Sequence, residues 1–211
     1  MAIVNFWLMK VGYAADSSGE ISGEAVVELL RRSRAGDLAA FERIIALHER
    51  RIARTAWRLL HRGEDVQDAA QEVYLRLYKS LRGFDERREL APWLYRITVN
   101  VCRDFNRRGG KDPVLSLDAP AADGARIEAV EPGASPYEQA AQRQEQLLIA
   151  EALRALPEKE RAAIVLRDLE GLSTREVAKV LGSTETTVRS QICRARLKLR
   201  QARGRLPGRT P

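Results

Sequence analysis

The stretch GLSTREVAKVLGSTETTVRSQICRARLKL, residues 171–199, decides how the second half of the chain folds. Ser173 is followed three residues later by Glu176, which is the spacing of a capping box at the start of a helix. Gly182 can take the positive φ of a tight turn, and Ser183 is expected to cap a second helix. Two short helices joined by a glycine turn predict a helix-turn-helix.

The two helices of this motif each carry one apolar side. In the first helix this side comprises Val177, Ala178 and Leu181. In the second it is a stripe with spacings of four, three and four residues, which comprises Val188, Ile192, Ala195 and Leu199. Because an α-helix has about 3.6 residues per turn, each set shares one face and is expected to pack inward.

The other side of the second helix carries small and basic residues. Such side chains suit the floor of a DNA major groove, so we predict that this side contacts duplex DNA. The residues predicted to do so are Thr186, Thr187, Arg189, Ser190, Cys193, Arg194, Arg196 and Lys198. Basic residues after Arg194 would contact phosphates and add affinity with little sequence information. The alternative is an ordinary solvated helix face.

Composition places the chain among soluble globular proteins with an excess of positive charge. Its 211 residues are 45% hydrophobic and 31% charged, with a formal net charge of +7. This charge indicates a polyanionic partner, either nucleic acid or an anionic membrane surface. The two cysteines, Cys102 and Cys193, have no CxxC spacing, so neither a disulfide framework nor a zinc site is predicted. A reducing cytoplasm fits this cysteine content.

The chain divides into five segments. They are a disordered extension over 1–22, a helical domain over 23–110, a Pro-rich linker over 111–138, a helix-turn-helix domain over 139–204 and a tail over 205–211. The linker region is acidic, because residues 111–140 contain two basic and six acidic residues, a net charge of −4. Neither β-alternation of useful length nor a membrane-spanning run occurs. We therefore predict an all-α protein of two small helical domains without membrane insertion.

The stretch WLYRITVNVCRDFNRR, residues 93–108, predicts a helix with a second basic face. Leu94, Ile97, Val101 and Phe105 share its apolar side. The polar side, together with aromatic residues at the start, comprises Trp93, Tyr95, Arg96, Asn100, Arg103, Arg107 and Arg108. Such a surface could follow a DNA backbone and stack on bases, as single-strand binders do. For Trp93, packing in the core is the alternative.

The stretch EDVQDAAQEVYLRLYKSL, residues 64–81, predicts a helix with apolar residues on both sides. Its inward face comprises Val66, Ala69, Ala70, Val73, Leu77 and Leu81. The opposite face comprises Asp68, Gln71, Glu72, Leu75 and Tyr78. Two large apolar residues among acids and amides favour a docking patch for another protein's helix, although isolated surface apolar residues are also common.

Five runs in this order resemble a bacterial RNA polymerase sigma factor of the extracytoplasmic-function group. The similarity covers residues 24–203, which include the Pro-rich linker. The runs are DLAAFERIIALHERRIARTAWRLL, EDVQDAAQEVYLRLYKSL, FDERRELAPWLYRITVNVCRDFNRR, LPEKERAAIVLRDLEGLSTREVAKVLG and TTVRSQICRARLKL. One departure is Cys193, where relatives often have an aromatic residue.

The resemblance implies a role for each surface. It implies that the helix at 64–81 binds core RNA polymerase through Asp68, Gln71, Glu72, Leu75 and Tyr78. It implies that residues 84–108 capture and melt the minus-ten promoter element, and that residues 184–199 read the minus-thirty-five element. The linker would run toward the RNA exit path of the polymerase. Core RNA polymerase, promoter DNA and an anti-sigma factor are the expected partners, with no cofactor, metal or small-molecule substrate.

Two other functions compete with this interpretation. A stand-alone dimeric repressor would use the helix-turn-helix, but it leaves the first domain unexplained. A DNA-processing enzyme would need a catalytic or metal-ligand cluster. The two histidines, His48 and His61, belong to no such spacing, so an enzyme is not expected.

Overall fold

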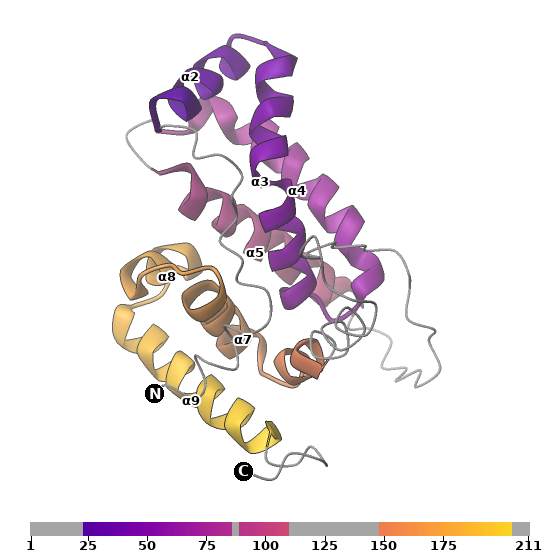
Figure 1. Cartoon of the computed structure of the whole chain (residues 1–211), viewed down its shortest axis with the longest axis vertical. Coiled ribbons are helices and arrows are strands. Elements are labelled where there is room, and N and C mark those ends of the chain that lie inside the picture. Colours follow the sequence, from indigo (N-terminus) through magenta and orange to yellow (C-terminus); the bar gives the residue numbers. More distant parts are fainter. Residues whose placement is uncertain (1–22, 86–88, 110–147, 204–211) are drawn as a thin grey trace, which may run out of the picture. The chain divides into compact units, whose positions relative to one another are not determined.

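The computed structural model describes residues 23–85, 89–109 and 148–203, which fall into two compact units (Figure 1). The first unit contains the described residues up to 109, and the second contains 148–203. Every regular element in these described ranges is a helix or a helical turn, and none is a strand. The prediction of an all-α fold is therefore confirmed. The expected extension, the linker and the tail lie outside the described residues.

The first unit is built around one long helix, α3, which packs against the three other helices of this unit. Its α-helices are α2 (Gly23–Arg34), α3 (Leu38–Leu59), α4 (Val66–Ser80) and α5 (Leu90–Gly109). Two 3₁₀ turns, η1 (Gly63–Asp65) and η2 (Leu81–Gly83), flank α4. Among the described residues, no helix is long and apolar enough to cross a membrane.

Helix α3 begins where Asp37 caps its first turn. The carboxylate accepts a hydrogen bond from the Ala40 amide at 3.1 Å and forms an ion pair with Arg32 at 2.7 Å. These contacts, the amide first, lower the pKa of Asp37. Gly36, with φ of 97°, makes the tight turn before the cap, a conformation that favours glycine. The sequence GD thus separates α2 from α3.

The inward face of α4 agrees with the sequence prediction. All six residues assigned to it are buried, namely Val66, Ala69, Ala70, Val73 and Leu77 of α4, and Leu81 at the start of η2. They pack against α3 and α5, so one side of α4 is fully used by the core of the first unit.

The buried face of α5 is rotated relative to the predicted one. Leu94 and Val101 are buried as expected, but Ile97 and Phe105 are only half-buried. Burial extends instead to Tyr95, Thr98, Val99 and Cys102. The rotation follows from the position of α5, which packs against both α3 and α4 and therefore buries a wider arc than one apolar stripe.

Both ends of α5 are fixed by polar or aromatic contacts with other elements. At its end, the Asn106 amide donates to the carbonyl of Leu59 at 3.0 Å and accepts from the His61 amide at 3.0 Å. At its start, Trp93 stacks on Phe84 with ring centroids 4.5 Å apart. The register of α5 against α3 is therefore set by side chains that a helical pattern does not reveal.

The second unit contains the predicted helix-turn-helix. Its elements are a helical segment over 148–154, α7 (Glu158–Ile164), a π-helical turn η3 (Val165–Leu169), α8 (Thr174–Leu181) and α9 (Glu185–Arg203). The capping box is present, since the Glu176 amide donates to Ser173 Oγ at 3.2 Å and the Ser173 amide donates to Glu176 Oε2 at 2.6 Å. Gly182 has φ of 62°, as the turn requires.

Two details of the motif differ from the prediction. Thr184, rather than Ser183, caps α9, because its hydroxyl accepts a hydrogen bond from the Thr187 amide at 3.2 Å. In α8 the buried residues are Val177, Ala178 and Val180, whereas Leu181 is half-buried. The stripe predicted for the second helix is confirmed, since Val188, Ile192, Ala195 and Leu199 are all buried. Gln191 of α9 is buried as well, and most of the other side chains of this helix are exposed.

Candidate nucleic-acid and docking surfaces

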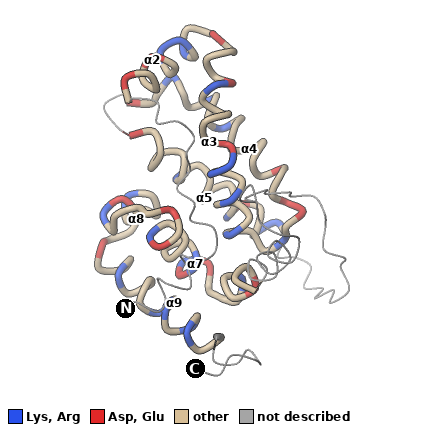
Figure 2. Tube along the Cα trace, viewed as in Figure 1, with Lys and Arg blue, Asp and Glu red and all other residues tan. Residues whose placement is uncertain are grey.

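The exposed side of α9 has a central strip of small and apolar residues. The strip comprises Thr186, Ser190, Cys193 and Leu197, all exposed. At about 100° per residue, this strip lies opposite the buried stripe and is flanked by two rows of basic side chains. One row contains Arg194 and Lys198, and the other contains Arg189 and Arg196. Figure 2 shows basic residues recurring along α9, with acidic residues on the neighbouring helices.

The first basic row is paired with a carboxylate from α7. Lys198 Nζ donates to Glu160 Oε2 at 2.8 Å, and Arg194 Nε lies 3.6 Å from Glu160 Oε1. The side chain of Glu160 is only 10% exposed, whereas those of Arg194 and Lys198 remain accessible. The buried acid therefore lies behind basic groups that still reach solvent.

The second row is paired more tightly, through the ion pair of Arg196. Arg196 donates through Nε at 2.9 Å and Nη2 at 2.7 Å to the two carboxylate oxygens of Asp168, whose side chain is 5% exposed. These hydrogen bonds raise the pKa of Arg196. This pair fixes the orientation of the guanidinium and leaves its Nη1 group unengaged by Asp168, so contact of Arg196 with DNA stays a prediction. Arg189 pairs with Glu185 of its own helix at 2.9 Å and stays exposed.

The π-helical turn η3 carries the acid that holds Arg196. Within it, the Glu170 amide donates to the carbonyl of Val165 at 3.0 Å, five residues earlier. The turn continues α7 and contains Asp168. The ion pair joins positions 28 apart in the sequence, so it fixes α9 against the element that precedes α8.

The polar residues on the outer side of α5 are mostly exposed. Arg96, Asn100, Arg107 and Arg108 are exposed, and Arg103 is half-buried. Trp93 is half-buried, because its ring packs on Phe84, so the core-packing alternative holds for part of its surface. Tyr95 was predicted to stack on bases, but it is only 4% exposed. That prediction is wrong, since the ring belongs to the core.

A network of charges joins α5 to α4. Arg76 pairs with Glu72 of its own helix at 2.7 Å and with Asp104 of α5 at 2.9 Å. Asp104 also pairs with Arg107 at 3.3 Å. Hydrogen bonds to Glu72 and then Asp104 raise the pKa of Arg76. The polar side of α4 is thereby fixed relative to the basic side of α5.

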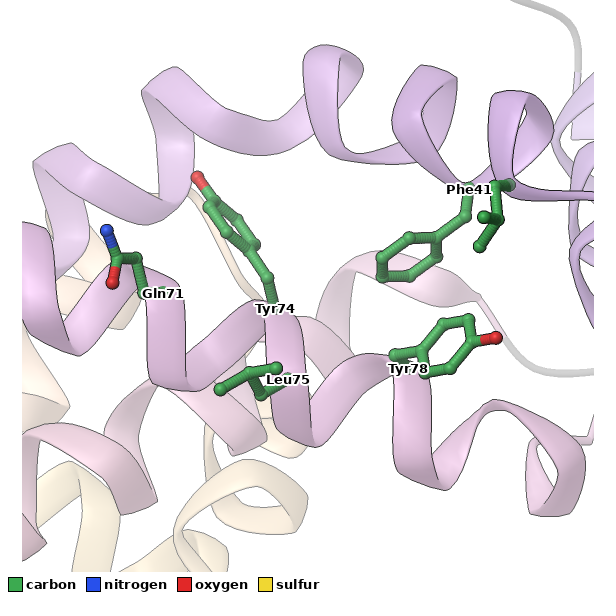
Figure 3. Close-up of a pocket in the computed structure, with 6 residues that line it drawn as sticks. Phe41, Gln71, Tyr74, Leu75 and Tyr78 are labelled. Atoms are coloured by element: carbon green, nitrogen blue, oxygen red, sulfur yellow. The ribbon is translucent and has the colours of Figure 1, made fainter.

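The outer face of α4 forms part of an apolar groove of about 430 Å³. Its lining residues are Leu38, Phe41, Gln71, Tyr74, Leu75 and Tyr78. Figure 3 shows Phe41 of α3 facing Tyr78 of α4, and their ring centroids are 5.0 Å apart with the planes at 67°. Leu38, Leu75 and Tyr78 are 60%, 54% and 45% exposed. Three large apolar side chains therefore lie exposed together along this groove.

The predicted docking residues lie on this side of α4, but one of them, Glu72, is engaged within the unit. Asp68 and Gln71 are exposed beside the apolar pair, and Glu72 is half-buried and paired with Arg76. Sequence reasoning missed Leu38 and Phe41, which α3 contributes to the same groove. Their spacing of three residues was the available signal, but nothing in a helical pattern indicates which second helix lies beside α4.

Within 23–85, 89–109 and 148–203, no group of three or more His, Cys, Asp or Glu residues could hold a metal ion. Comparisons with known proteins identify the two units. Residues 44–111 match the family described as Sigma-70 region 2, and residues 146–199 match Sigma-70, region 4. The two matches fall on the first and second unit.

Named relatives extend the similarity over most of the chain. The ECF RNA polymerase sigma factor SigM of Mycobacterium tuberculosis is 34% identical over 181 residues, which is 85% of each chain. The ECF RNA polymerase sigma-E factor of Escherichia coli is 33% identical over 189 residues, covering 85% of this chain and 93% of the relative. The structure of CnrH in complex with the cytosolic domain of CnrY is similar with a TM-score of 0.63 and 27% identity, over 85% of this chain and 97% of that one. The chain therefore belongs to the ECF RNA polymerase sigma factors, whose members direct transcription initiation.

Proposed function

We propose that three exposed surfaces divide the work of this sigma factor. The apolar groove between α3 and α4 binds core RNA polymerase, the outer side of α5 holds the minus-ten element, and the outer side of α9 reads the minus-thirty-five element. The observation that carries the proposal is the exposure of Leu75 and Tyr78 in the groove. The six inward residues of 66–81 are buried, and Leu75 and Tyr78 still remain exposed on the opposite side of α4.

The groove has the properties of a site for a partner helix. Leu38, Leu75 and Tyr78 offer apolar contact area along α4 and the start of α3. Asp68 and Gln71 lie exposed on the same side of α4 and would form its polar rim. An apolar centre with a polar rim is the usual anatomy of a protein–protein interface. Amphipathic helices bind in such grooves through anchors at helical spacing.

The outer side of α5 is proposed to hold the separated minus-ten strand. Arg96, Asn100 and Arg108 are exposed, and no ion pair within the described residues occupies them. Basic side chains in this arrangement bind the phosphate backbone with a strong salt dependence. The accessible part of Trp93 supplies one surface on which a base could stack.

The outer side of α9 is proposed to enter the major groove at the minus-thirty-five element. Thr186, Ser190 and Cys193 form the strip that would face base edges, and Arg194 lies beside it. Arginine reads guanine through its O6 and N7 atoms, while small side chains allow the helix to approach. Lys198, with part of its charge balanced by Glu160, is assigned to phosphates.

The chain is proposed to act as a binding protein with a regulator of its own. Its actions are binding, strand separation and delivery of the polymerase active site, so the chain itself is proposed to catalyse no reaction. It acts in the cytoplasm, where promoter DNA and core RNA polymerase meet. An anti-sigma factor is the proposed regulator, and the acidic linker over 111–138 is proposed to follow the path that nascent RNA later takes. The complex of CnrH with the cytosolic domain of CnrY supports a regulator of this kind.

In vitro transcription tests the proposed function. Purified full-length chain is added to core RNA polymerase with a library of genomic promoter fragments, and transcripts are sequenced at their starts. We expect discrete start sites that share two upstream motifs at a fixed spacing. Core enzyme without the chain is the control. Absence of chain-dependent starts would contradict the proposal, and a palindromic footprint of the chain alone on DNA would favour a repressor instead.

A further inference from the structure

We propose that Glu160 is a positioning residue for base reading: it orients Arg194 toward a guanine and lowers the general affinity for DNA. The inference rests on the proposed role of α9 at the minus-thirty-five element. Glu160 is on α7, outside the recognition helix, and sequence reasoning assigned it no role. The three groups that carry the inference are Glu160, Arg194 and Lys198.

The geometry places one buried carboxylate behind two basic residues of the same row. Arg194 and Lys198 are four residues apart on α9, so their side chains are neighbours on one side of the helix. Glu160 Oε2 accepts a hydrogen bond from Lys198 at 2.8 Å, and Oε1 lies 3.6 Å from Arg194 Nε. One oxygen of the carboxylate therefore faces Lys198, and the other faces Arg194.

Arg194 and Arg196, whose acidic neighbours lie outside α9, differ in which of their N–H donors remain available. Arg196 uses both Nε and Nη2 on Asp168. Arg194 has an ion pair at Nε and no hydrogen bond from its Nη groups to the described residues. Reading a guanine takes two parallel donors at a fixed angle. Arg194 therefore keeps all its Nη donors available for O6 and N7, whereas Asp168 engages two of the five N–H donors of Arg196.

Restricting Arg194 favours specific over non-specific binding. A free arginine side chain loses much rotamer entropy when it takes up the one orientation that reads a base. A carboxylate at Nε removes part of that freedom before DNA arrives. The same negative charge repels phosphates and balances Lys198, so it weakens binding that does not depend on sequence. Glu160 thus strengthens binding to the specific site and weakens binding to DNA of any sequence.

A selection experiment separates the two effects. Holoenzyme is formed from full-length chain and core polymerase, and it selects duplexes from a randomised library long enough to contain both promoter elements. Sequencing gives the base preference at every position. Arg194→Ala should reduce the preference at one position by about 5- to 150-fold. Glu160→Gln should reduce the preference at that same position by about threefold or more and leave the others within about twofold.

Binding to a non-promoter duplex is measured in parallel by fluorescence anisotropy. Glu160→Gln should bind this duplex equally well or up to about threefold more tightly, because one negative charge is removed. Glu151→Gln is the matched control: it removes one exposed carboxylate from the same unit and should leave every base preference unchanged.

Each outcome bears on the proposal. An unchanged preference at the Arg194 position in Glu160→Gln would overturn it. A uniform loss at all positions, together with a lower melting temperature, would show that Glu160 only supports the fold and would also overturn it. If Arg194→Ala itself altered no single position, the assignment of the reading face of α9 would fail first, which distinguishes the two failures.

Discussion

The sequence assigned the outer faces of both α4 and α9 to binding partners. In the structure the two faces differ in how many of their side chains already have contacts within the chain. On α4, Leu75 and Tyr78 lie exposed in an open groove. On α9, the acids Glu160 and Asp168 lie behind the basic rows and occupy part of their donors. An apolar surface can be satisfied only by a partner, whereas a charged surface can be arranged in advance by the fold. Charge counted from sequence therefore overestimates the contacts available on α9.

The largest effect is expected on the α4 side. Leu75→Glu should leave the fold intact, because exposed substitutions usually change the free energy of unfolding by no more than about 0.5 kcal/mol. In a partner interface the new carboxylate would be buried unpaired, which costs roughly 2 kcal/mol or more of binding free energy. We expect normal circular dichroism and melting temperature, but no co-purification with core RNA polymerase.

Ala46→Glu is the control for this variant, since it adds the same charge to an exposed position of α3 that does not line the groove. It should bind core polymerase normally. A drop of many degrees in the melting temperature of Leu75→Glu would show that Leu75 belongs to the core, and full polymerase binding would show that the groove serves another purpose.

The next effect distinguishes residues within one basic row of α9. Arg194→Ala should cost roughly 1 to 3 kcal/mol of binding free energy, mostly at one promoter position. Lys198→Ala should weaken all promoters about equally and by less, because Glu160 already balances its charge. Anisotropy titrations of holoenzyme with promoter duplexes that differ at single base pairs measure both. Equal, uniform losses would contradict the assignment of the base-reading face.

A smaller effect on stability is expected where α9 is anchored. Asp168→Asn removes the charge from a two-bond pair with Arg196 and should lower the free energy of unfolding by about 1 to 2 kcal/mol, since Arg196 is partly solvated. Arg196→Gln and the double variant complete the cycle. Urea unfolding should give a coupling energy of similar size. Additive losses would mean that the pair does not anchor the helix.

The smallest effect is a pH dependence that belongs to the first unit. Burial, followed by the charge of Arg51, lowers the pKa of His48 from 6.5 to about 4. Between these values the unfolded chain binds a proton that the folded chain does not, so stability falls as the pH decreases. We expect a loss of about 1 kcal/mol between pH 6.5 and about 5. His48→Gln should flatten this part of the stability curve, and an unchanged slope would contradict the assignment.

Helical periodicity was sufficient to predict which residues of α4 and α9 face inward. The six inward residues of α4 and the stripe of Val188, Ile192, Ala195 and Leu199 are all buried. The capping box at Ser173 and the turn at Gly182 were also predictable, because each depends on residues a few positions apart. Local patterns determine local geometry, and they located the surfaces proposed for function.

Contacts between elements could not be predicted in this way. Asp168 and Arg196 are 28 positions apart, and only the packing of η3 and α9 brings them together. Tyr95 looked like a surface aromatic, but α5 buries a wider arc than its apolar stripe indicates. The contribution of Leu38 and Phe41 to the groove likewise depends on α3 lying beside α4. These contacts remove Tyr95 from the predicted DNA-binding residues and add α3 to the helix predicted for docking.

Hydroxyl-radical footprinting of the free chain, the holoenzyme and the holoenzyme with promoter duplex tests the central claim most directly. Leu75, Tyr78 and Cys193 are exposed in the free chain and should react, while the buried Cys102 should not. We predict that core polymerase alone protects Leu75 and Tyr78, and that Cys193 becomes protected only when promoter DNA is added. Continued reactivity of Leu75 and Tyr78 in the holoenzyme would contradict the assignment of the α4 groove to the polymerase.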